Sequence, residues 1–334
     1  MAFSKFVGQI ASMVNSFDNS KTAQEVTAQR ITRRDALRLL GSASAGAGFA
    51  VQIGLNLSAP TSAFAGSLKD AATRPLAGGA PTSPERTALI EAFKQQSEGL
   101  QDKFEARTHK SDWTMPYRLF RPAAKGRLPL VVYLSGSGGL GDDNKKQLEL
   151  GNIYGTRIWL LPENQKKFPC YVLAPQTDRG WAKYDTTQDD SGPAKVIPGL
   201  GDGDRLALEI VDALCREFAI DQRHIYVAGQ SMGGAGTWNM LSSRPRFFAA
   251  AVICCGSRST EDGSESLATP LWAFQGDADQ TVPVTLSRDR IAARRKAGGR
   301  PLYTEYADVD HNCWQWAFTE PELTKWVFAQ RRAG

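Results

Sequence analysis

The residues best suited to chemistry lie in the segment His224–Gly236, which reads HIYVAGQSMGGAG. Its apolar start predicts a buried strand, and its end predicts a helix. Between them stands a G-x-S-x-G sequence centred on Ser231, which is the context of a nucleophile elbow. Such a turn strains the central residue and leaves no room for side chains at Gly229 and Gly233. We therefore expect Ser231 to expose a nucleophilic hydroxyl, and the Met232 N–H, at the helix start, to bind developing negative charge.

A serine hydroxyl is a weak nucleophile until a base within hydrogen-bond reach takes its proton. The chain has three histidines. His109 precedes the expected sheet, and His224 begins the strand that leads to Ser231, at the end far from the hydroxyl. His311 follows the last expected strand, at the carboxyl edge where sites form in open α/β sheets. We therefore expect His311 to be the base.

The acid that orients this base should lie between the serine and the histidine in the chain. Residues 276–283 read GDADQTVP and follow an expected strand at the same sheet edge. Asp279 stands in the D-x-x-V-P pattern typical of an acid loop, so we expect it to orient His311. Asp277 competes with it but is better placed to brace the turn, and Asp310 should point elsewhere.

A second donor for the oxyanion should come from the glycine loop after the apolar run 128–134. This loop reads SGSGG, so the expected donor is the N–H of Gly136 or Ser137, beside that of Met232. The loop also contains a G-x-G-x-x-G sequence, a pattern of dinucleotide sites. No strand follows that would carry the acidic residue such a site needs, so we expect no cofactor.

Apolar runs of strand length alternate with segments of helical periodicity along most of the chain. This alternation predicts an α/β fold with a doubly wound, mostly parallel sheet and helices on both faces. The expected strands cover 115–122, 128–134, 170–175, 224–228, 248–255, 271–275 and 301–306, and the expected helices include 87–93, 204–218, 235–241, 292–295 and 321–331.

The N-terminal segment resembles a twin-arginine export signal. Arg33 and Arg34 precede an uncharged stretch rich in Ala, Gly and Ser, which ends in an A-x-A cleavage pattern at Ala65. We expect a signal peptide over 1–65, a linker and N-terminal helix over 66–100, and a catalytic domain over 101–334. The twin-arginine export machinery would then be a partner, and the protein would be periplasmic or secreted. An amphipathic helix with a linker, or an uncleaved membrane anchor, are the alternatives.

Charge and cysteine content narrow the remaining classes. The net charge is +5, but six of the basic and only three of the acidic residues fall within 1–65. The rest of the chain is nearly neutral and has no basic stripe, so we expect no nucleic-acid partner. The five cysteines show no metal-ligand spacing, so we expect no metal site. Cys313 lies two residues after His311, and Cys254 and Cys255 end a neighbouring expected strand at the same sheet edge. We therefore expect a disulfide between Cys313 and Cys254 or Cys255, and buried free thiols are the alternative.

Several segments together resemble α/β-hydrolase esterases and peptidases related to dienelactone hydrolase, polyhydroxybutyrate depolymerase and feruloyl esterase. They are Tyr133–Gly139 with Gly141–Asn144, Gly229–Gly234 with Gly236–Trp238 and Arg244–Ala250, Gly276–Pro283, and His311–Trp314. The resemblance covers about residues 113–330. It implies hydrolysis of carboxylic esters or peptides without a metal or cofactor. Ser135 stands where the family usually has histidine, which bears on the geometry of the oxyanion hole.

The sequence therefore predicts a serine hydrolase that cleaves small or polymeric carboxylic esters. A peptidase or an acyltransferase of the same fold remains open, as does a non-catalytic binding protein. Candidate substrate contacts are Trp181, Trp314 and Gln230, and either tryptophan is as well suited to the core or the rim. The acyl length of the substrate and the oligomeric state do not follow from the sequence.

Overall fold

The computed structural model describes residues 83–184, 196–256 and 267–332. The expected signal peptide over 1–65 and most of the expected linker lie outside the described residues. No helix within the described ranges is both long enough and apolar enough to cross a membrane.

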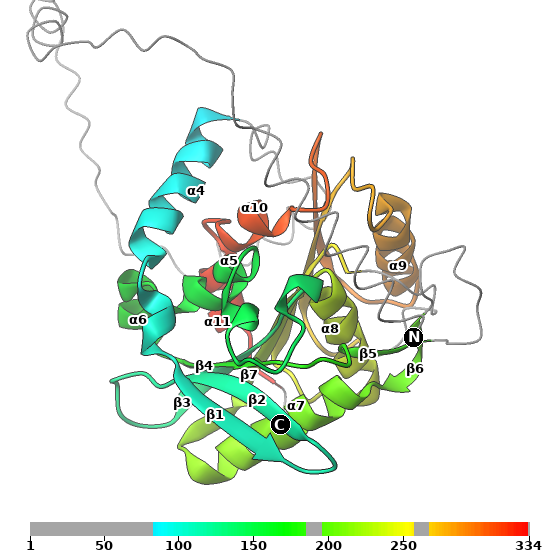
Figure 1. The fold of residues 1–334 in the computed structure, drawn as a ribbon. Helices are drawn as coiled ribbons and strands as arrows, with labels where there is room; N and C mark the ends of the chain where they lie inside the picture. The colour runs from blue at the N-terminus through cyan, green and yellow to red at the C-terminus, as the bar shows by residue number, and fades with distance from the viewer. Residues whose placement is uncertain (1–82, 185–195, 257–266, 333–334) are drawn as a thin grey trace, which may run out of the picture.

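One eight-stranded sheet organises the molecule, in the strand order β1-β2-β4-β3-β7-β8-β9-β10 (Figure 1). Six neighbouring strands, β4, β3, β7, β8, β9 and β10, run parallel, while β1 and β2 are antiparallel to their neighbours. The strands are β1 (Glu105–Lys110), β2 (Thr114–Phe120), β3 (Leu128–Leu134), β4 (Tyr171–Pro175), β7 (Ile220–Gln230), β8 (Ala250–Cys254), β9 (Leu271–Gly276) and β10 (Leu302–Tyr306). A separate hairpin pairs β5 (Ala182–Tyr184) with β6 (Val196–Leu200).

Helices cover both faces of the sheet (Figure 1). They are α4 (Pro84–Ser97), α5 (Asn152–Arg157), α6 (Pro162–Lys167), α7 (Asp202–Glu217), α8 (Met232–Ser243), α9 (Val284–Lys296), α10 (Trp314–Phe318) and α11 (Leu323–Phe328). Side chains of α7, α8 and α9 pack into one core, and those of α4, α5, α10 and α11 pack into the other. The expected doubly wound α/β-hydrolase architecture is confirmed.

Strand β3 shows why its apolar run is continuous rather than alternating. Val131 and Tyr133 face the core beneath α5 and α10, whereas Val132 and Leu134 face the core beneath α7 and α8. All four side chains are fully buried. A parallel strand covered on both faces needs apolar residues at every position, so β3 lies where its sequence predicts.

Helix α4 belongs to this fold and is fastened to the far end of the chain. Its N-cap Ser83 accepts a hydrogen bond from the Arg86 N–H at 3.2 Å. Ile90 and Phe93 enter the core beneath α10. The Arg86 guanidinium donates to Glu320 at 2.6 Å, and both side chains are only 9% exposed.

Several elements differ from the sequence prediction. Helices α5 and α6 were not expected, and α9 covers Val284–Lys296 rather than 292–295. Strand β1 was not expected, and His109 lies within it rather than before the sheet. The hairpin of β5 and β6 was also missed. The expected helix 321–331 is shorter, covering Leu323–Phe328 as α11, and α10 precedes it.

Candidate active site

The turn from β7 to α8 has the predicted elbow geometry. Ser231 has φ 52° and ψ −119°, a conformation that non-glycine residues rarely adopt. Its N–H donates to the Cys254 carbonyl of β8 at 2.9 Å, which fixes the elbow to the sheet. A Cβ at Gly229 would lie 2.2 Å from the Gly233 oxygen, and one at Gly233 would lie 2.0 Å from the Leu134 oxygen. The expected strain at the serine and the need for both glycines are confirmed.

His311 is the histidine that reaches this serine. The Ser231 Oγ lies 2.7 Å from His311 Nε2, within hydrogen-bond range. The other two histidines pair with surface acids, His109 with Glu209 at 3.2 Å and His224 with Asp221 at 2.8 Å. The structure therefore brings together the predicted nucleophile and base from positions 80 residues apart.

Asp279, in the loop after β9, completes the arrangement. Its Oδ2 lies 2.8 Å from His311 Nδ1, and its side chain has no exposed area. Its Oδ1 accepts the backbone N–H groups of Thr281 at 2.9 Å and Val282 at 2.8 Å. The carboxylate is therefore held in one orientation, toward the imidazole.

The two competing aspartates have the other roles expected of them. Asp277 Oδ1 accepts the N–H of Asp308 at 2.7 Å and so braces the turn against the loop after β10. Asp310 Oδ1 accepts the N–H groups of Gln280 at 3.0 Å and His311 at 2.7 Å. Asp279 is thus the aspartate whose carboxylate contacts the imidazole of His311.

Gln275 is a site residue that the sequence reasoning missed. This fully buried side chain at the end of β9 donates from Nε2 to Asp279 Oδ2 at 2.7 Å and to the Val282 carbonyl at 3.0 Å. Its Oε1 accepts from Ser287 of α9 at 2.8 Å. A lone polar residue at the end of the apolar strand 271–276 was the available signal, because a buried amide must be paired.

The environment of His311 acts on its basicity in both directions. Burial lowers its pKa, whereas the contacts with Cys255 and with the Asp279 carboxylate raise it more strongly. The net effect is a pKa above its ordinary value of 6.5. Because burial keeps the Cys255 thiol neutral, the Asp279 carboxylate is the charged partner that stabilises protonated His311, and it contributes to making His311 a stronger base toward Ser231 than a free imidazole.

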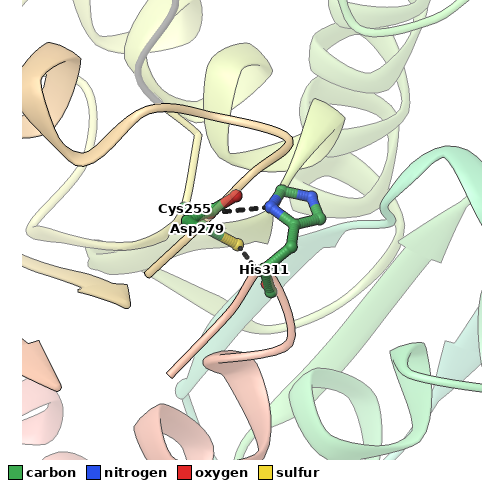
Figure 2. Close-up of side chains that lie close together, drawn as sticks. All are labelled: Cys255, Asp279 and His311. Carbon is green, nitrogen blue, oxygen red and sulfur yellow. Dashed lines mark hydrogen bonds and ion pairs between the residues drawn. The ribbon is translucent and has the colours of Figure 1, made fainter. Parts of the chain in front are cut away.

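The expected disulfide is wrong, because all five cysteines are free thiols. Cys255 has φ 39°, and its thiol donates to the His311 carbonyl at 3.3 Å (Figure 2). The Cys313 thiol points instead toward the Phe274 carbonyl of β9 at 3.8 Å. Burial raises the pKa of both thiols, so they act as neutral donors under the histidine loop.

Cys255, Asp279 and His311 are also the group of described residues with metal-ligand atoms gathered closely, all within 4.8 Å of one another (Figure 2). The sequence spacing did not suggest this group. A metal on His311 Nδ1 would compete with the hydrogen bond to Asp279 and would force the ring proton onto Nε2, the atom that must accept from Ser231. The arrangement therefore suits proton transfer better than resident metal binding.

The structure distinguishes between the two N–H groups, of Gly136 and Ser137, that were predicted as the second oxyanion donor. The Gly136 N–H donates to Asn152 Oδ1 at 3.1 Å, so Gly136 is not the second donor. Ser137 begins the 3₁₀ turn η2 (Ser137–Gly139), and Met232 begins α8. The first N–H groups of a helix have no acceptor within it. Ser137 and Met232 are therefore the donors that this geometry favours.

The candidate substrate contacts fall into two groups. Trp181 is fully buried and donates from its indole to the Ser135 carbonyl at 2.8 Å, so it supports the oxyanion loop from the core and cannot line a subsite. Gln230 is 3% exposed, and its Oε1 accepts the hydroxyl of Tyr133 at 2.7 Å. Trp314 is half-buried, and its ring stands edge-on to that of His311, with centroids 5.5 Å apart. Of the three, Trp314 is the one beside the reacting groups.

The loop after η2 is tied down through Gln176, another residue that the sequence analysis did not single out. Its Nε2 donates to the Gly139 carbonyl at 3.2 Å and to Asp143 Oδ1 at 2.9 Å. Its Oε1 accepts the N–H of Asn144 at 2.5 Å, a residue with φ 56°. Pairing on both sides of this buried amide fixes the path of the oxyanion loop.

Comparison with known proteins supplies structural neighbours. A scan against protein-family models finds no match, and a search of curated proteins finds none either. Among solved structures, a thermostable esterase is 32% identical with a TM-score of 0.63, and the match covers 70% of this chain. This chain spans 64% of that esterase's length. A candidate dipeptidyl aminopeptidase IV from Bacteroides ovatus is 16% identical with a TM-score of 0.52, covering 68% of this chain and 36% of the other.

Proposed function

The chain belongs to the α/β-hydrolase fold family, and on that premise we propose that it is a serine hydrolase that cleaves carboxylic esters through an acyl-enzyme. One observation carries the proposal. The Ser231 hydroxyl, the His311 imidazole and the Asp279 carboxylate form a continuous hydrogen-bonded series, with atom separations of 2.7 Å and 2.8 Å. This is the geometry that nucleophilic catalysis by serine requires.

In the proposed first half-reaction, Ser231 Oγ attacks the ester carbonyl while His311 Nε2 takes its proton. Asp279 stabilises the resulting imidazolium and keeps Nδ1 protonated. The carbonyl oxygen becomes an oxyanion between the N–H groups of Ser137 and Met232. Collapse of this intermediate breaks the C–O bond of the ester, and His311 returns the proton to the departing alcohol.

In the second half-reaction, water replaces the alcohol. His311 takes a proton from the water, whose oxygen attacks the acyl carbonyl. The intermediate again collapses, the carboxylic acid leaves, and Ser231 regains its hydroxyl proton from His311. The N–H groups on the oxyanion side contribute because they are aligned before the charge forms.

The comparisons favour an ester over a peptide as substrate. The neighbour that is 32% identical is an esterase, whereas the peptidase neighbour is 16% identical and is informative about the fold alone. Ester cleavage is therefore the main proposal, and peptide cleavage or acyl transfer to an alcohol are alternative outcomes of its test.

The test combines a covalent probe with two substrate series. We expect a fluorophosphonate to label Ser231, p-nitrophenyl esters to be hydrolysed, and aminoacyl p-nitroanilides to be cleaved far more slowly. Ser231→Ala should lose the label and lower kcat by about 10⁵-fold. Ser242→Ala, on the same helix, is the matched control and should retain both.

Each contrary result has a distinct meaning. Labelling with faster anilide than ester cleavage would indicate a peptidase. Labelling with product formed chiefly on added alcohols would indicate an acyltransferase. An unlabelled Ser231 in folded protein would refute the enzyme and leave a binding protein of the same fold.

We also propose that residues 1–65 direct export through the twin-arginine machinery, with cleavage after Ala65. The support is the sequence alone, namely the arginine pair and the uncharged stretch that ends in A-x-A. Mass spectrometry of the exported protein should find an N-terminus at Gly66. Replacing Arg33 and Arg34 by lysine should retain the uncleaved precursor in the cytoplasm, and export of that variant at the normal rate would refute the proposal.

A further inference from the structure

Leu150 is an exposed leucine with an unfavourable backbone conformation. Among the described residues, the exposed large hydrophobic side chains are Leu89, Leu150 and Leu267, and Leu150 is the most exposed at 56%. Its φ of 49° lies in the left-handed region, which is unfavourable for a side chain of this kind. A single exposed leucine is ordinary on a protein surface, so it is the left-handed backbone at Leu150, together with its position beside the candidate site, that makes it a candidate substrate contact.

The position of Leu150 places it against the oxyanion loop. It lies between η3 (Lys146–Leu148) and α5, and its carbonyl accepts the Ile153 N–H at 3.2 Å. Its Cδ1 is 3.8 Å from the point where a Cβ on Gly138 would stand. Gly138 directly follows Ser137, the proposed oxyanion donor. Leu150 therefore flanks the place where a substrate carbonyl would be held.

The next residue connects this side chain to the base. Gly151 approaches the Trp314 indole so closely that a Cβ there would lie 2.7 Å from Nε1. The indole in turn stands edge-on to the His311 ring, at an interplanar angle of 88°. Leu150 and Trp314 thus lie on adjoining chain segments, one beside the oxyanion loop and one beside the base.

The chemistry of the two half-reactions assigns different substrate groups to these positions. The departing alcohol must lie next to His311, because that imidazole protonates it. The acyl group projects from the carbonyl carbon in another direction, and its oxygen lies at the oxyanion loop. Leu150, whose Cδ1 lies beside Gly138 of that loop, is therefore placed to meet the acyl chain.

We infer that Leu150 is a specificity-determining residue that binds the apolar acyl chain of the ester, with Trp314 continuing the same apolar surface toward the leaving group. The inference rests on the proposed function. It assigns the substrate class as esters of aliphatic acids longer than acetate. Each additional methylene that this surface covers should improve transition-state binding about fourfold.

The experiment measures kcat/KM for p-nitrophenyl acetate, butyrate and hexanoate. In the unaltered protein, kcat/KM should rise with acyl length. Leu150→Asn removes the apolar side chain while suiting the left-handed backbone, which asparagine tolerates well. This variant should retain its thermal midpoint, lose about tenfold on hexanoate and change less than twofold on acetate. Leu267→Asn, another exposed leucine in a turn outside the candidate site, is the matched control and should leave all three values unchanged.

Two results of the ester series would overturn the inference. Equal loss on acetate and hexanoate would mean that Leu150 only supports the loop, and no loss on hexanoate would mean that the acyl chain lies elsewhere. Fluorophosphonates that carry an ethyl or a hexyl chain test binding at Leu150 separately from the proposed ester hydrolysis, because their rate of labelling of Ser231 is measured without ester turnover. Faster labelling by the hexyl probe, lost in Leu150→Asn, would support the surface even if no ester were hydrolysed. Equal labelling by both probes would refute it.

Discussion

The acid side and the oxyanion side of the site are built in opposite ways. The Asp279 carboxylate accepts from Gln275, Thr281, Val282 and His311 and has no exposed area. On the oxyanion side, Ser137 and Met232 stand at helix starts, where N–H groups have no helical acceptor. On the acid side, the donors surround a carboxylate that is charged before the reaction begins. On the oxyanion side, the N–H groups are available to an oxyanion that would form only during the proposed reaction.

If the site acts as proposed, this difference separates the features that contribute to stability from those that contribute to catalysis. A buried carboxylate is tolerated only when its oxygens are paired. Unpaired N–H groups beside the nucleophile do not improve folding, but they stabilise an oxyanion strongly because they need no reorganisation. Changes on the acid side should therefore alter the base and its pH dependence, whereas changes on the oxyanion side should lower kcat at every pH.

Between the acid side and the oxyanion side, the largest effect is expected from Asp279→Asn. The amide cannot stabilise the imidazolium and favours the wrong tautomer of His311, so kcat should fall by about 10⁴-fold. Steady-state kinetics with a p-nitrophenyl ester measure this loss, and circular dichroism checks the fold. Asp277→Asn, in the same loop, should stay within about threefold, and a similar loss in both variants would contradict the assignment of Asp279.

The pH profile of the unaltered protein and of Asp279→Asn tests the same side by a second measurement. His311 must be neutral to accept the Ser231 proton, and its pKa is raised above 6.5. Activity should therefore be low in acid, rise with pH and reach its plateau only above the ordinary histidine pKa, with about a tenfold loss for each pH unit below the inflection. In Asp279→Asn the residual activity should inflect at lower pH, because the raising carboxylate is gone. An unchanged inflection would mean that Asp279 does not raise the pKa of His311.

A smaller effect is expected from Gln275→Leu. The substitution removes one donor from Asp279 and leaves the Ser287 hydroxyl without its acceptor, while the volume stays similar. We expect a destabilisation of about 1–3 kcal/mol and about a tenfold lower kcat, with the inflection of the pH profile displaced. Urea unfolding and the pH profile measure the two effects. Gln280→Leu, at an exposed glutamine in the same loop, is the control. A normal pH profile in Gln275→Leu would mean that Gln275 contributes to packing and does not position Asp279.

The smallest effect is expected on the oxyanion side, from Trp181→Phe. This variant keeps most of the buried ring but loses the hydrogen bond to the Ser135 carbonyl, worth about 1 kcal/mol. The loop that carries Ser137 should become less well aligned, so kcat should fall about fivefold with no change in the pH inflection. A displaced pH inflection in Trp181→Phe would show that the oxyanion side also affects His311, and would contradict the separate roles of the two sides.

The sequence predicts those features whose physics is local or periodic. Strand β3 is covered on both faces, so every position is apolar and its predicted bounds match the structure. The elbow was predictable because its glycines and strained serine have purely local causes. His311 followed from elimination among three histidines, and Asp279 from its position after β9.

The missed features depend on partners distant in the chain. Strand β1 lies at the sheet edge with half of its side chains exposed, so its charged sequence EARTHK carries no burial signal. Trp181 looks like a subsite residue until its indole is seen to bond the Ser135 carbonyl. The expected position of Cys254, Cys255 and Cys313 at one sheet edge suggested a disulfide, but the Cys255 and Cys313 thiols have different backbone acceptors. No sequence pattern indicates which carbonyl a side chain meets.

The bond between Arg86 and Glu320 sets a limit on how far the chain can be shortened by proteases. It joins the first described helix to the segment before α11, with both partners nearly removed from water. Trimming into α4 would strand the Glu320 charge in the interior, a loss of about 3–5 kcal/mol, and would uncover the core that Ile90 and Phe93 fill. A processing enzyme that cuts upstream of Ser83 leaves a durable product, whereas one that cuts past it produces a substrate for further degradation.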